Sequence, residues 1–390
     1  MKSVVLVFED AAGLPQAELD GRTPLEIARC PAATRIVAEG WGGVLGKPPG
    51  RALPTAETRL ATLCGLPPAS AALAARGPLE AVALGVDVSG HAYAFRGDLV
   101  TLDDGLLRDG QLARLTLQET EQLAREVQTL FDPARVRFIA SAPGRTVVLV
   151  REDHGKSRSA QAPWLLEGED ISSLPSGHSW ELFREVLEKS AQAFARQTIN
   201  DVRVDLGENP ASALWLWGGG SLARLHGDPS LRGLVLTQSA MAAGLGAALG
   251  FEVEPLLDPW AAQHPSEVMD DERLRRWFKE FDRIVVYVEA PPELRRGPAR
   301  ERVRLLERMD VLLTQPLLEA FKWTKDRRLA LVSVESAAPE EGGRRAPQLV
   351  AVWGSHMDPD SVLHWDEPSC KAGRLAGVSA DEVAGLLIGE

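Results

Sequence analysis

Short continuous runs of β-branched and apolar residues, separated by helical patterns, constrain the fold of this chain more than any other feature. The clearest runs are residues 4–8, 284–288 and 329–334. An uninterrupted apolar run is typical of a strand covered on both faces, as in a parallel sheet, since a half-exposed strand alternates apolar with polar residues. Helical patterns at 23–39 and 300–321 stand between such runs. The alternation predicts an α/β fold with a mostly parallel sheet.

One segment, 91–205, breaks this alternation. Its strand patterns lie at 92–101, 136–140 and 146–150, and its helical patterns lie at 116–130 and 180–198. Between them, residues 155–177 are rich in Ser, Gly and Pro, which predicts a long surface connection. We therefore predict an inserted α+β domain at 91–205 and a core formed by residues 1–90 and 206–390.

The composition narrows the classes of function. The chain has 390 residues, and 43 Lys and Arg against 55 Asp and Glu give a formal net charge of −12. An acidic chain is not expected to track the phosphates of a nucleic acid. The apolar run near the N-terminus is too short for a signal sequence or a membrane span, so we expect neither export nor a membrane. Three distant cysteines, Cys30, Cys64 and Cys370, argue against a disulfide framework or a thiolate zinc site and favour the cytoplasm.

Acidic residues follow three of the predicted strands. Glu9 and Asp10 end the first run, and Glu289 and Glu335 follow the two later ones. Because ligands of open parallel sheets bind at the carboxyl ends of strands, these carboxylates could converge on a divalent cation. Acids are also common where a buried strand meets solvent, and this alternative stays open.

Two further patterns favour simple loops over ligand sites. The triglycine at 218–220 follows an expected strand at 213–217 and precedes an expected helix, in a GxGxxA arrangement that formally matches a dinucleotide-binding turn. The acid expected about 20 residues later, which would bind a ribose, is missing. A group of histidines and aspartates at 356–366 has a spacing that fits no helical pair of metal ligands, which favours a solvated loop.

Several motifs, in one order along nearly the whole chain, resemble landmarks of a known family. They are LDGRTPLE at 19–26, RGPLEA at 76–81, AFR at 94–96, GENPASALWLWGGG at 207–220 and YVEAP at 287–291. Together they resemble the archaeal-type 2,3-bisphosphoglycerate-independent phosphoglycerate mutases. The resemblance implies an alkaline-phosphatase-like, three-layer α/β core with an inserted domain. It also implies a transiently phosphorylated hydroxyl and two divalent ions, typically Mn²⁺, Zn²⁺ or Mg²⁺, which lower the pKa of the nucleophile and neutralise the phosphoryl group.

The chain departs from the family at the implied metal ligands. Glu9 stands where the family has an aspartate, and Asp10 stands where it has a glycine. Glu335 and Ser336 replace an aspartate and a histidine, and the segment 292–296 lacks the family's aspartate and histidine. We therefore expect either no metal or a single divalent cation, held by what remains of the site, namely Glu9, Asp10 and Glu335.

The implied nucleophile is altered as well, whereas the implied phosphate-binding arginines are retained. Ala56 stands at the position of the family's serine, so only the adjacent Thr55 offers a hydroxyl there. Guanidinium groups suit phosphate or carboxylate, although an arginine can equally brace the inserted domain against the core. The arginines at or near the family's positions are Arg76, Arg96, Arg145 and Arg203.

These observations leave two hypotheses. One is a phosphoglycerate mutase-like phosphoryl-transfer enzyme, weakly active or inactive, that works with an altered site. The other is a metal-free pseudoenzyme that binds an anionic or phosphorylated metabolite, or a protein partner. Removing ligands from a two-metal site costs several kcal/mol of transition-state stabilisation, which favours the second hypothesis.

Overall fold

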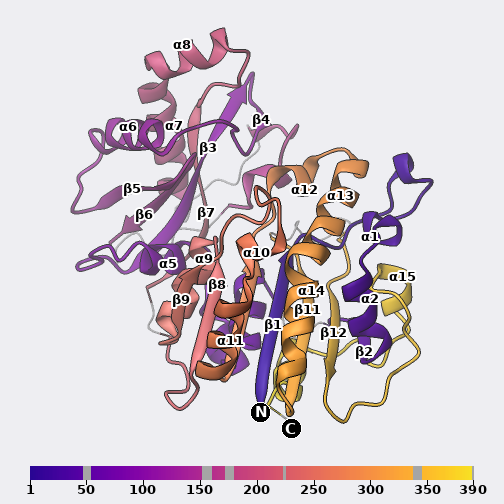
Figure 1. Ribbon diagram of the computed structural model, residues 1–390. Helices are drawn as coiled ribbons and strands as arrows, with labels where there is room; N and C mark the ends of the chain where they lie inside the picture. Colours follow the sequence, from indigo (N-terminus) through magenta and orange to yellow (C-terminus); the bar gives the residue numbers. More distant parts are fainter. Residues whose placement is uncertain (47–53, 152–159, 172–179, 223–224, 337–344, 389–390) are drawn as a thin grey trace. The chain divides into compact units, whose positions relative to one another are not determined.

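The computed structural model describes residues 1–46, 54–151, 160–171, 180–222, 225–336 and 345–388 (Figure 1). The chain divides into two compact units. Unit 1 comprises Met1–Ala72 and Leu225–Glu390, and unit 2 comprises Leu73–Arg224. Among the described residues, no helix is both long enough and apolar enough to cross a membrane.

Unit 1 contains a seven-stranded sheet with the strand order β2-β12-β11-β1-β10-β8-β9. The five strands from β11 to β9 are parallel, and β12 and β2 are antiparallel additions at one side. The strands are β1 (Lys2–Glu9), β2 (Trp41–Val44), β8 (Gly233–Thr237), β9 (Glu252–Pro255), β10 (Arg283–Val288), β11 (Arg327–Val334) and β12 (Leu349–Gly354). This sheet confirms the predicted fold class.

Helices cover the sheet of unit 1. The longer ones are α2 (Pro31–Ala38), α3 (Ala56–Leu63), α9 (Ala240–Ala248), α11 (Asp271–Glu280) and α13 (Ala299–Met309). The shorter ones are α1 (Pro24–Ile27), α4 (Pro68–Ala71), α10 (Pro265–Val268), α12 (Pro292–Arg296), α14 (Gln315–Ala320), α15 (Glu367–Cys370) and α16 (Ala380–Leu386). One group, α2, α11 and α14, packs together, while α3 contacts α9 and α16. Figure 1 shows α11, α13 and α14 in front of the strands.

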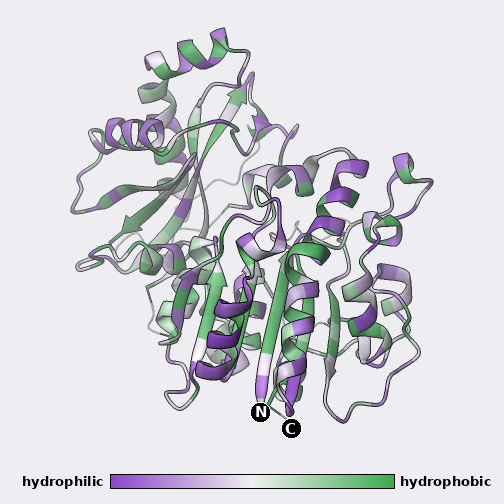
Figure 2. Cartoon of the chain, viewed as in Figure 1, coloured by the Kyte–Doolittle hydropathy of each residue, from purple (hydrophilic) through white to green (hydrophobic). Residues whose placement is uncertain are grey.

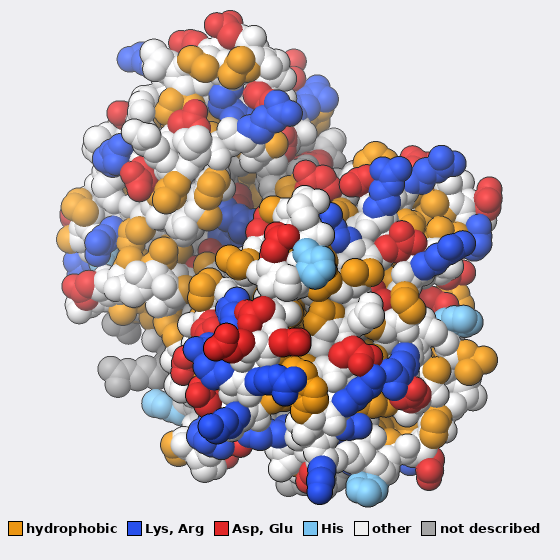
Figure 3. Space-filling view, viewed as in Figure 1, with side chains coloured by type: hydrophobic (Ala, Val, Ile, Leu, Met, Phe, Trp, Pro, Cys, Tyr) orange, Lys and Arg blue, Asp and Glu red, His pale blue; other side chains and the backbone are white. Residues whose placement is uncertain are grey.

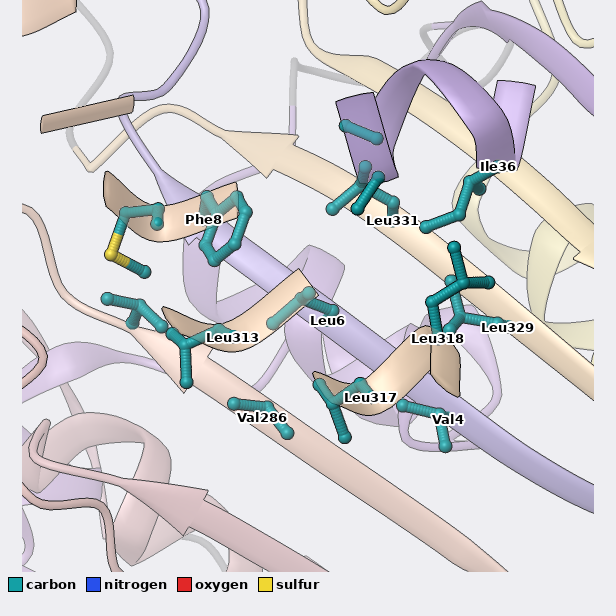
Figure 4. Packing of buried hydrophobic residues seen from close by; sticks show 14 of the residues in the cluster. Val4, Leu6, Phe8, Ile36, Val286, Leu313, Leu317, Leu318, Leu329 and Leu331 are labelled. Atoms are coloured by element: carbon teal, nitrogen blue, oxygen red, sulfur yellow. The ribbon is translucent and has the colours of Figure 1, made fainter. Parts of the chain in front are cut away.

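The core of unit 1 lies between the sheet and the first of these helix groups (Figure 4). Alternate residues of β1, namely Val4, Leu6 and Phe8, face this layer and are 5% exposed or less. Figure 4 shows them beside Ile36, Val286, Leu313, Leu317, Leu318, Leu329 and Leu331. Burying a side chain of this size contributes about 1.5–3 kcal/mol. Figure 2 shows the same pattern as hydrophobic strands flanked by helices with hydrophilic outer faces.

Two predicted helices of unit 1 are interrupted. The pattern at 23–39 forms α1 and α2, because Pro31 has no N–H and disfavours a helical residue before it. The pattern at 300–321 is divided by a π-helical turn, Asp310–Thr314, between α13 and α14. Gly42 and Gly43, just after the pattern at 23–39, lie in β2, where a Cβ at Gly43 would lie 2.2 Å from the Leu375 carbonyl carbon.

Unit 2 has an antiparallel sheet. It is formed by β3 (Tyr93–Asp103), β4 (Leu106–Asp109), β5 (Val136–Ala142), β6 (Arg145–Val150) and β7 (Ala213–Ser221). The strand order is β4-β3-β6-β5, and β7 pairs with β3. The helices of unit 2 are α5 (Arg76–Ala83), α6 (Leu117–Gln128), α7 (Glu181–Phe194) and α8 (Thr198–Asp205). An α+β unit is therefore inserted in the chain of unit 1.

The structure corrects the interpretation of the triglycine. Residues 218–220 continue β7 to Ser221 and do not form a turn between a strand and a helix. A Cβ at Gly219 would lie 2.2 Å from the Phe95 ring, so only a glycine allows β7 and β3 to pack this closely. The division at 73–224 also differs from the predicted boundaries at 91–205, because β7 pairs with β3 and α5 packs against both strands.

Candidate functional site: the carboxyl edge of the parallel sheet

The acids predicted to gather at one edge of the sheet come from adjacent strands. Glu9 is the last residue of β1 and Asp10 follows it. Glu289 follows β10 and Glu335 follows β11, and these strands flank β1 on either side. Because all three strands are parallel, their carboxyl ends lie at the same edge.

An arginine lies between two of these carboxylates. Arg295 of α12 donates from Nη2 to Glu9 Oε2 at 2.7 Å and from Nε to Asp10 Oδ2 at 3.0 Å. Its side chain is only 4% exposed. Glu9 also accepts hydrogen bonds from Tyr287 Oη at 2.8 Å and from the Ala290 N–H at 3.0 Å. The charge of this pair of acids is therefore offset in part by a cation of unit 1 itself.

Burial and charge shift the pKa values at this edge. Burial raises the pKa of Asp10, and the neighbouring Glu9 raises it further, against the opposing effect of Arg295. Burial by itself would lower the pKa of Arg295, but Glu9, Asp10 and Glu289 together raise it above its ordinary value. Burial also raises the pKa of Glu335 to about 7, although Arg345 opposes this shift.

These residues do not fit the two divalent ions implied by the family resemblance. Within the described ranges, no three His, Cys, Asp or Glu side chains are grouped so that they could hold a metal ion. Glu9 and Asp10 direct oxygens to the guanidinium of Arg295, which a cation would have to displace. The histidines at 356 and 364 lie outside the helices and strands, and His356 has a φ of 60°, which agrees with the predicted loop.

The implied nucleophile position lies at the start of α3. Thr55 is the N-cap of this helix, and its Oγ1 accepts a hydrogen bond from the Thr58 N–H at 3.2 Å. Ala56, the first residue of the helix, is buried. Thr55 is exposed, but its hydroxyl is used to cap the helix, and no serine stands beside it. Its role as a phosphoryl acceptor stays a prediction.

A cavity of about 450 Å³ opens beside this edge of unit 1. Arg59, one turn into α3, lines it and is 2% exposed. Its Nε and Nη1 have no hydrogen-bond partner among the described residues, and neither does Glu335 Oε2, which also lines the cavity. Burial lowers the pKa of Arg59 to about 10, although Glu335 opposes the shift. The cavity is thus lined by hydrogen-bonding groups that the described residues do not satisfy.

The acids on other sides of the cavity have partners. Glu367 accepts from the Gly13 N–H at 2.7 Å and from Thr23 Oγ1 at 2.5 Å. Glu26 accepts from the Thr23 N–H at 2.8 Å in a capping box. The hydrogen bonds that these two carboxylates accept therefore stabilise the loop at Gly13 and the start of α1.

The predicted phosphate-binding arginines lie in unit 2. Arg96 on β3 is 1% exposed, forms ion pairs with Asp98 at 2.9 Å and Glu80 at 3.3 Å, and lies 5.0 Å from the centre of the Trp217 ring. Trp217 also donates to Asp98. The charge of Arg96 is therefore offset by carboxylates of unit 2 itself.

The other three arginines have different surroundings. Arg76, the first residue of α5, is buried with its guanidinium 5.2 Å from the Trp217 ring centre. Arg203 of α8 donates to the carbonyls of Asn209 at 2.7 Å and Ala113 at 3.0 Å, so it closes two loops. Arg145 begins β6. Substrate binding by all four arginines stays a prediction.

Sequence reasoning missed Arg295, Arg59 and Glu367. Arg295 lies in the segment 292–296, whose departure from the family motif was the available signal. Arg59 could have been noticed as a charged residue that follows Thr55 at the spacing of one helical turn. Nothing in the local pattern marks Glu367, which becomes part of the site only because α15 folds back to Gly13 and Thr23.

The fold and this edge define a class of protein: a three-layer α/β unit with acids at the carboxyl edge of a parallel sheet and an α+β unit inserted in its chain. Comparisons with known proteins show which family this chain resembles. The model of the family "2,3-bisphosphoglycerate-independent phosphoglycerate mutase" matches residues 49–200. The mutases of that name from Methanosarcina mazei and Methanosarcina acetivorans are each 27% identical to this chain, and each match covers 100% of both sequences.

Solved structures agree with this fold. The cofactor-independent phosphoglycerate mutase from Thermoplasma acidophilum superimposes with a TM-score of 0.54 at 21% identity, covering 100% of this chain and 99% of that one. A protein from Pyrococcus horikoshii gives 0.68 at 18% identity, with coverages of 99% and 96%. The resemblance is confirmed: this chain is similar to the 2,3-bisphosphoglycerate-independent phosphoglycerate mutases over its full length.

Proposed function

We propose that this chain is a phosphoglycerate mutase-like protein with a degraded two-metal site, which binds a small anionic metabolite in the cavity of unit 1 and does not catalyse efficient phosphoryl transfer. The observation that carries the proposal is Arg59, a buried arginine that lines this cavity with two N–H groups lacking partners among the described residues. Leaving buried donors without acceptors costs about 1–3 kcal/mol, and more for a charged group. An acceptor-rich ligand would recover this free energy.

The chemistry of the cavity favours a phosphate ester or carboxylate. Arg59, Arg345 and Lys371 supply positive charge to its lining. The carboxylates of Glu26 and Glu367 already accept hydrogen bonds from unit 1. Arg59 therefore offers donors to an anion, and Glu335, whose pKa burial raises to about 7, can face an anion in its protonated form. Water is the alternative occupant, and it would show no preference for phosphorylated anions.

Slow mutase activity is the second candidate function. It is favoured by the exposed Thr55 beside Ala56 at the start of α3, where a shift of the loop by one residue would bring a hydroxyl to the implied position. The capping bond to Thr58 opposes this use, because a phosphorylated Thr55 would lose that bond.

Thermal-shift measurements with 3-phosphoglycerate, phosphate and sulfate, against chloride at matched ionic strength, test binding. We expect phosphorylated anions to raise the melting temperature by a few degrees, since a ligand at a hundred times its dissociation constant adds about 2.7 kcal/mol of stability. Arg59→Met should reduce this increment, whereas Arg304→Met, at an exposed arginine of α13, should leave it unchanged. Equal shifts in wild type and Arg59→Met would contradict the proposed site.

An activity assay separates the two candidates. Interconversion of 3- and 2-phosphoglycerate with added Mn²⁺ should be undetectable or very slow. Robust turnover that disappears in Thr55→Ala would show that Thr55 is the nucleophile and that the chain is an enzyme. Turnover that persists in Thr55→Ala would point to a different acceptor.

A further inference from the structure

The contacts of Glu9 and Asp10 leave no oxygen of either carboxylate without a hydrogen bond. Glu9 Oε1 accepts from Tyr287 Oη at 2.8 Å, and Oε2 accepts from the Ala290 N–H at 3.0 Å and from Arg295 Nη2 at 2.7 Å. Asp10 Oδ1 accepts from the Ser336 N–H at 2.8 Å, and Oδ2 accepts from Arg295 Nε at 3.0 Å. A divalent cation bound to these oxygens would therefore have to share them with these donors, and it would meet the positive charge of Arg295.

We propose that Arg295 is the built-in cation of this edge: its guanidinium replaces a divalent ion as the counter-charge of Glu9 and Asp10, makes the stability of unit 1 independent of metal and keeps metal ions away from these carboxylates. This role does not depend on the metabolite proposed above, since it concerns the charge balance within unit 1.

Burial explains why a resident cation is needed. The Glu9 side chain is fully buried and that of Arg295 is 4% exposed, so neither charge is stabilised by bulk water. A buried carboxylate without a partner is strongly unfavourable, and two close to each other are more so. The planar guanidinium supplies separate N–H groups to the two acids, which the single ammonium of a lysine does less well.

The position of Arg295 is set by its helix. α12 begins at Pro292 directly after the loop that follows β10, with Pro291 as its N-cap. Leu294, next to Arg295, is 2% exposed and belongs to the core cluster of unit 1. The buried Leu294 side chain fixes α12 to the core, and Arg295 beside it contacts the acids at the end of β1.

Melting temperatures of the full chain in EDTA and in millimolar Mn²⁺ test the proposal. Wild type should melt at the same temperature in both. Arg295→Gln should melt roughly 5–10 °C lower in EDTA, because two buried carboxylates lose their counter-charge, and Mn²⁺ should recover part of this loss. Arg295→Lys should fall in between. Arg304→Gln, which removes an exposed arginine paired with Glu301 in α13, is the matched control and should melt like wild type in both buffers.

A triple variant, Glu9→Gln, Asp10→Asn and Arg295→Gln, separates charge balance from packing. It removes the acids together with the arginine, so it should melt above Arg295→Gln in EDTA and should not respond to Mn²⁺. If Arg295→Gln does not fold, the folding of the triple variant and the melting temperature of Arg295→Lys still test the proposal. The proposal is overturned if Mn²⁺ stabilises wild type, if Arg295→Gln is as stable as wild type or ignores Mn²⁺, or if the triple variant gains nothing over Arg295→Gln.

Discussion

Asp310 links two segments of unit 1 that are far apart in the chain. It lies in the π-helical turn after α13, and its carboxylate accepts from the N–H groups of Ala32 and Ala33 at 2.9 and 2.8 Å. These N–H groups belong to the first turn of α2, where no helical carbonyl can satisfy them. Asp310 is 2% exposed, and burial raises its pKa to about 6 against the effect of these two hydrogen bonds.

The raised pKa predicts how the stability contribution of Asp310 depends on pH. Between the ordinary value of 3.8 and about 6, the folded state binds the proton of this carboxyl more tightly than the unfolded state does. The free energy of unfolding of wild type relative to Asp310→Asn should therefore fall as the pH rises through this window, by at most about 1.4 kcal/mol per unit. Urea unfolding of both proteins at several pH values measures this. A difference that stays constant from pH 4 to 7, or that grows with pH, would contradict the assigned shift.

Two buried arginines, one in each unit, have the same arrangement of partners. Arg295 meets Glu9 and Asp10, and Arg96 meets Asp98 and Glu80. In each case one guanidinium contacts two carboxylates and offsets part of their negative charge. Arg59 differs from these two, because its Nε and Nη1 have no hydrogen-bond partner among the described residues, which motivates the proposed ligand.

Packing between α5 and β3 depends on one glycine. A Cβ at Gly77 would lie 2.6 Å from the backbone Cα and carbonyl carbon of Phe95 and 2.7 Å from the Ala94 carbonyl oxygen. These are backbone atoms of a strand paired on both sides, which cannot move without breaking the sheet. Close approach, and not backbone conformation, therefore requires glycine at this position.

Two helix substitutions should have opposite effects for this reason. Gly77→Ala should destabilise the protein by about 2–4 kcal/mol, because the added methyl overlaps β3. Gly385→Ala in α16, where nothing lies within 4 Å of the added Cβ, should stabilise by up to about 1 kcal/mol through helix propensity. Chemical denaturation of wild type and of the two variants measures these changes in the free energy of unfolding. If Gly77→Ala is neutral or stabilising, α5 does not pack against β3 as closely as described.

The molecule as a whole has a core in each unit. The cluster around β1 and β11 belongs to unit 1, and a smaller cluster around Ala94, Val147 and Leu149 belongs to unit 2. Figure 3 shows Lys and Arg side chains interspersed with Asp and Glu over the visible face, which agrees with the mixed charge patterns of the helices. With separate cores, a lesion in one unit is expected to loosen mainly that unit.

Arg96→Met tests this independence. It leaves Asp98 and Glu80 buried without their cation, so unit 2 should lose about 3–5 kcal/mol of stability. Hydrogen exchange followed by mass spectrometry should show faster exchange in β3, β6 and β7 and unchanged exchange in β1 and β10. Arg114→Met, at an arginine that is 81% exposed and pairs with Glu208, is the control and should leave both units unchanged. Equal acceleration in both units would show that they unfold as one.

Local patterns in the sequence were sufficient for the α/β class, the acids at the strand ends and the family resemblance. Apolar runs and helical periodicity depend on neighbouring residues, and parallel strands with acids after them can only bring those acids to one edge. The same local reasoning failed for the triglycine at 218–220, because whether a glycine run turns or continues a strand depends on its partner strand. Here that partner is β3, and the Phe95 ring leaves no room for a larger residue at position 219.

The pairing of charges was decided only by the tertiary structure. Arg295 and Glu9 are 286 positions apart, and no periodicity connects them. Their contact exists because β10 lies beside β1 and α12 is anchored by Leu294 against the core. The electrostatic energy of a buried group depends on the distances to all its neighbours and on its exclusion from water, neither of which a local pattern contains. The sequence therefore determined which residues could form a site. The fold decided that the carboxylates of Glu9 and Asp10 meet a guanidinium, and that Arg59 lines the cavity with its Nε and Nη1 lacking hydrogen-bond partners among the described residues.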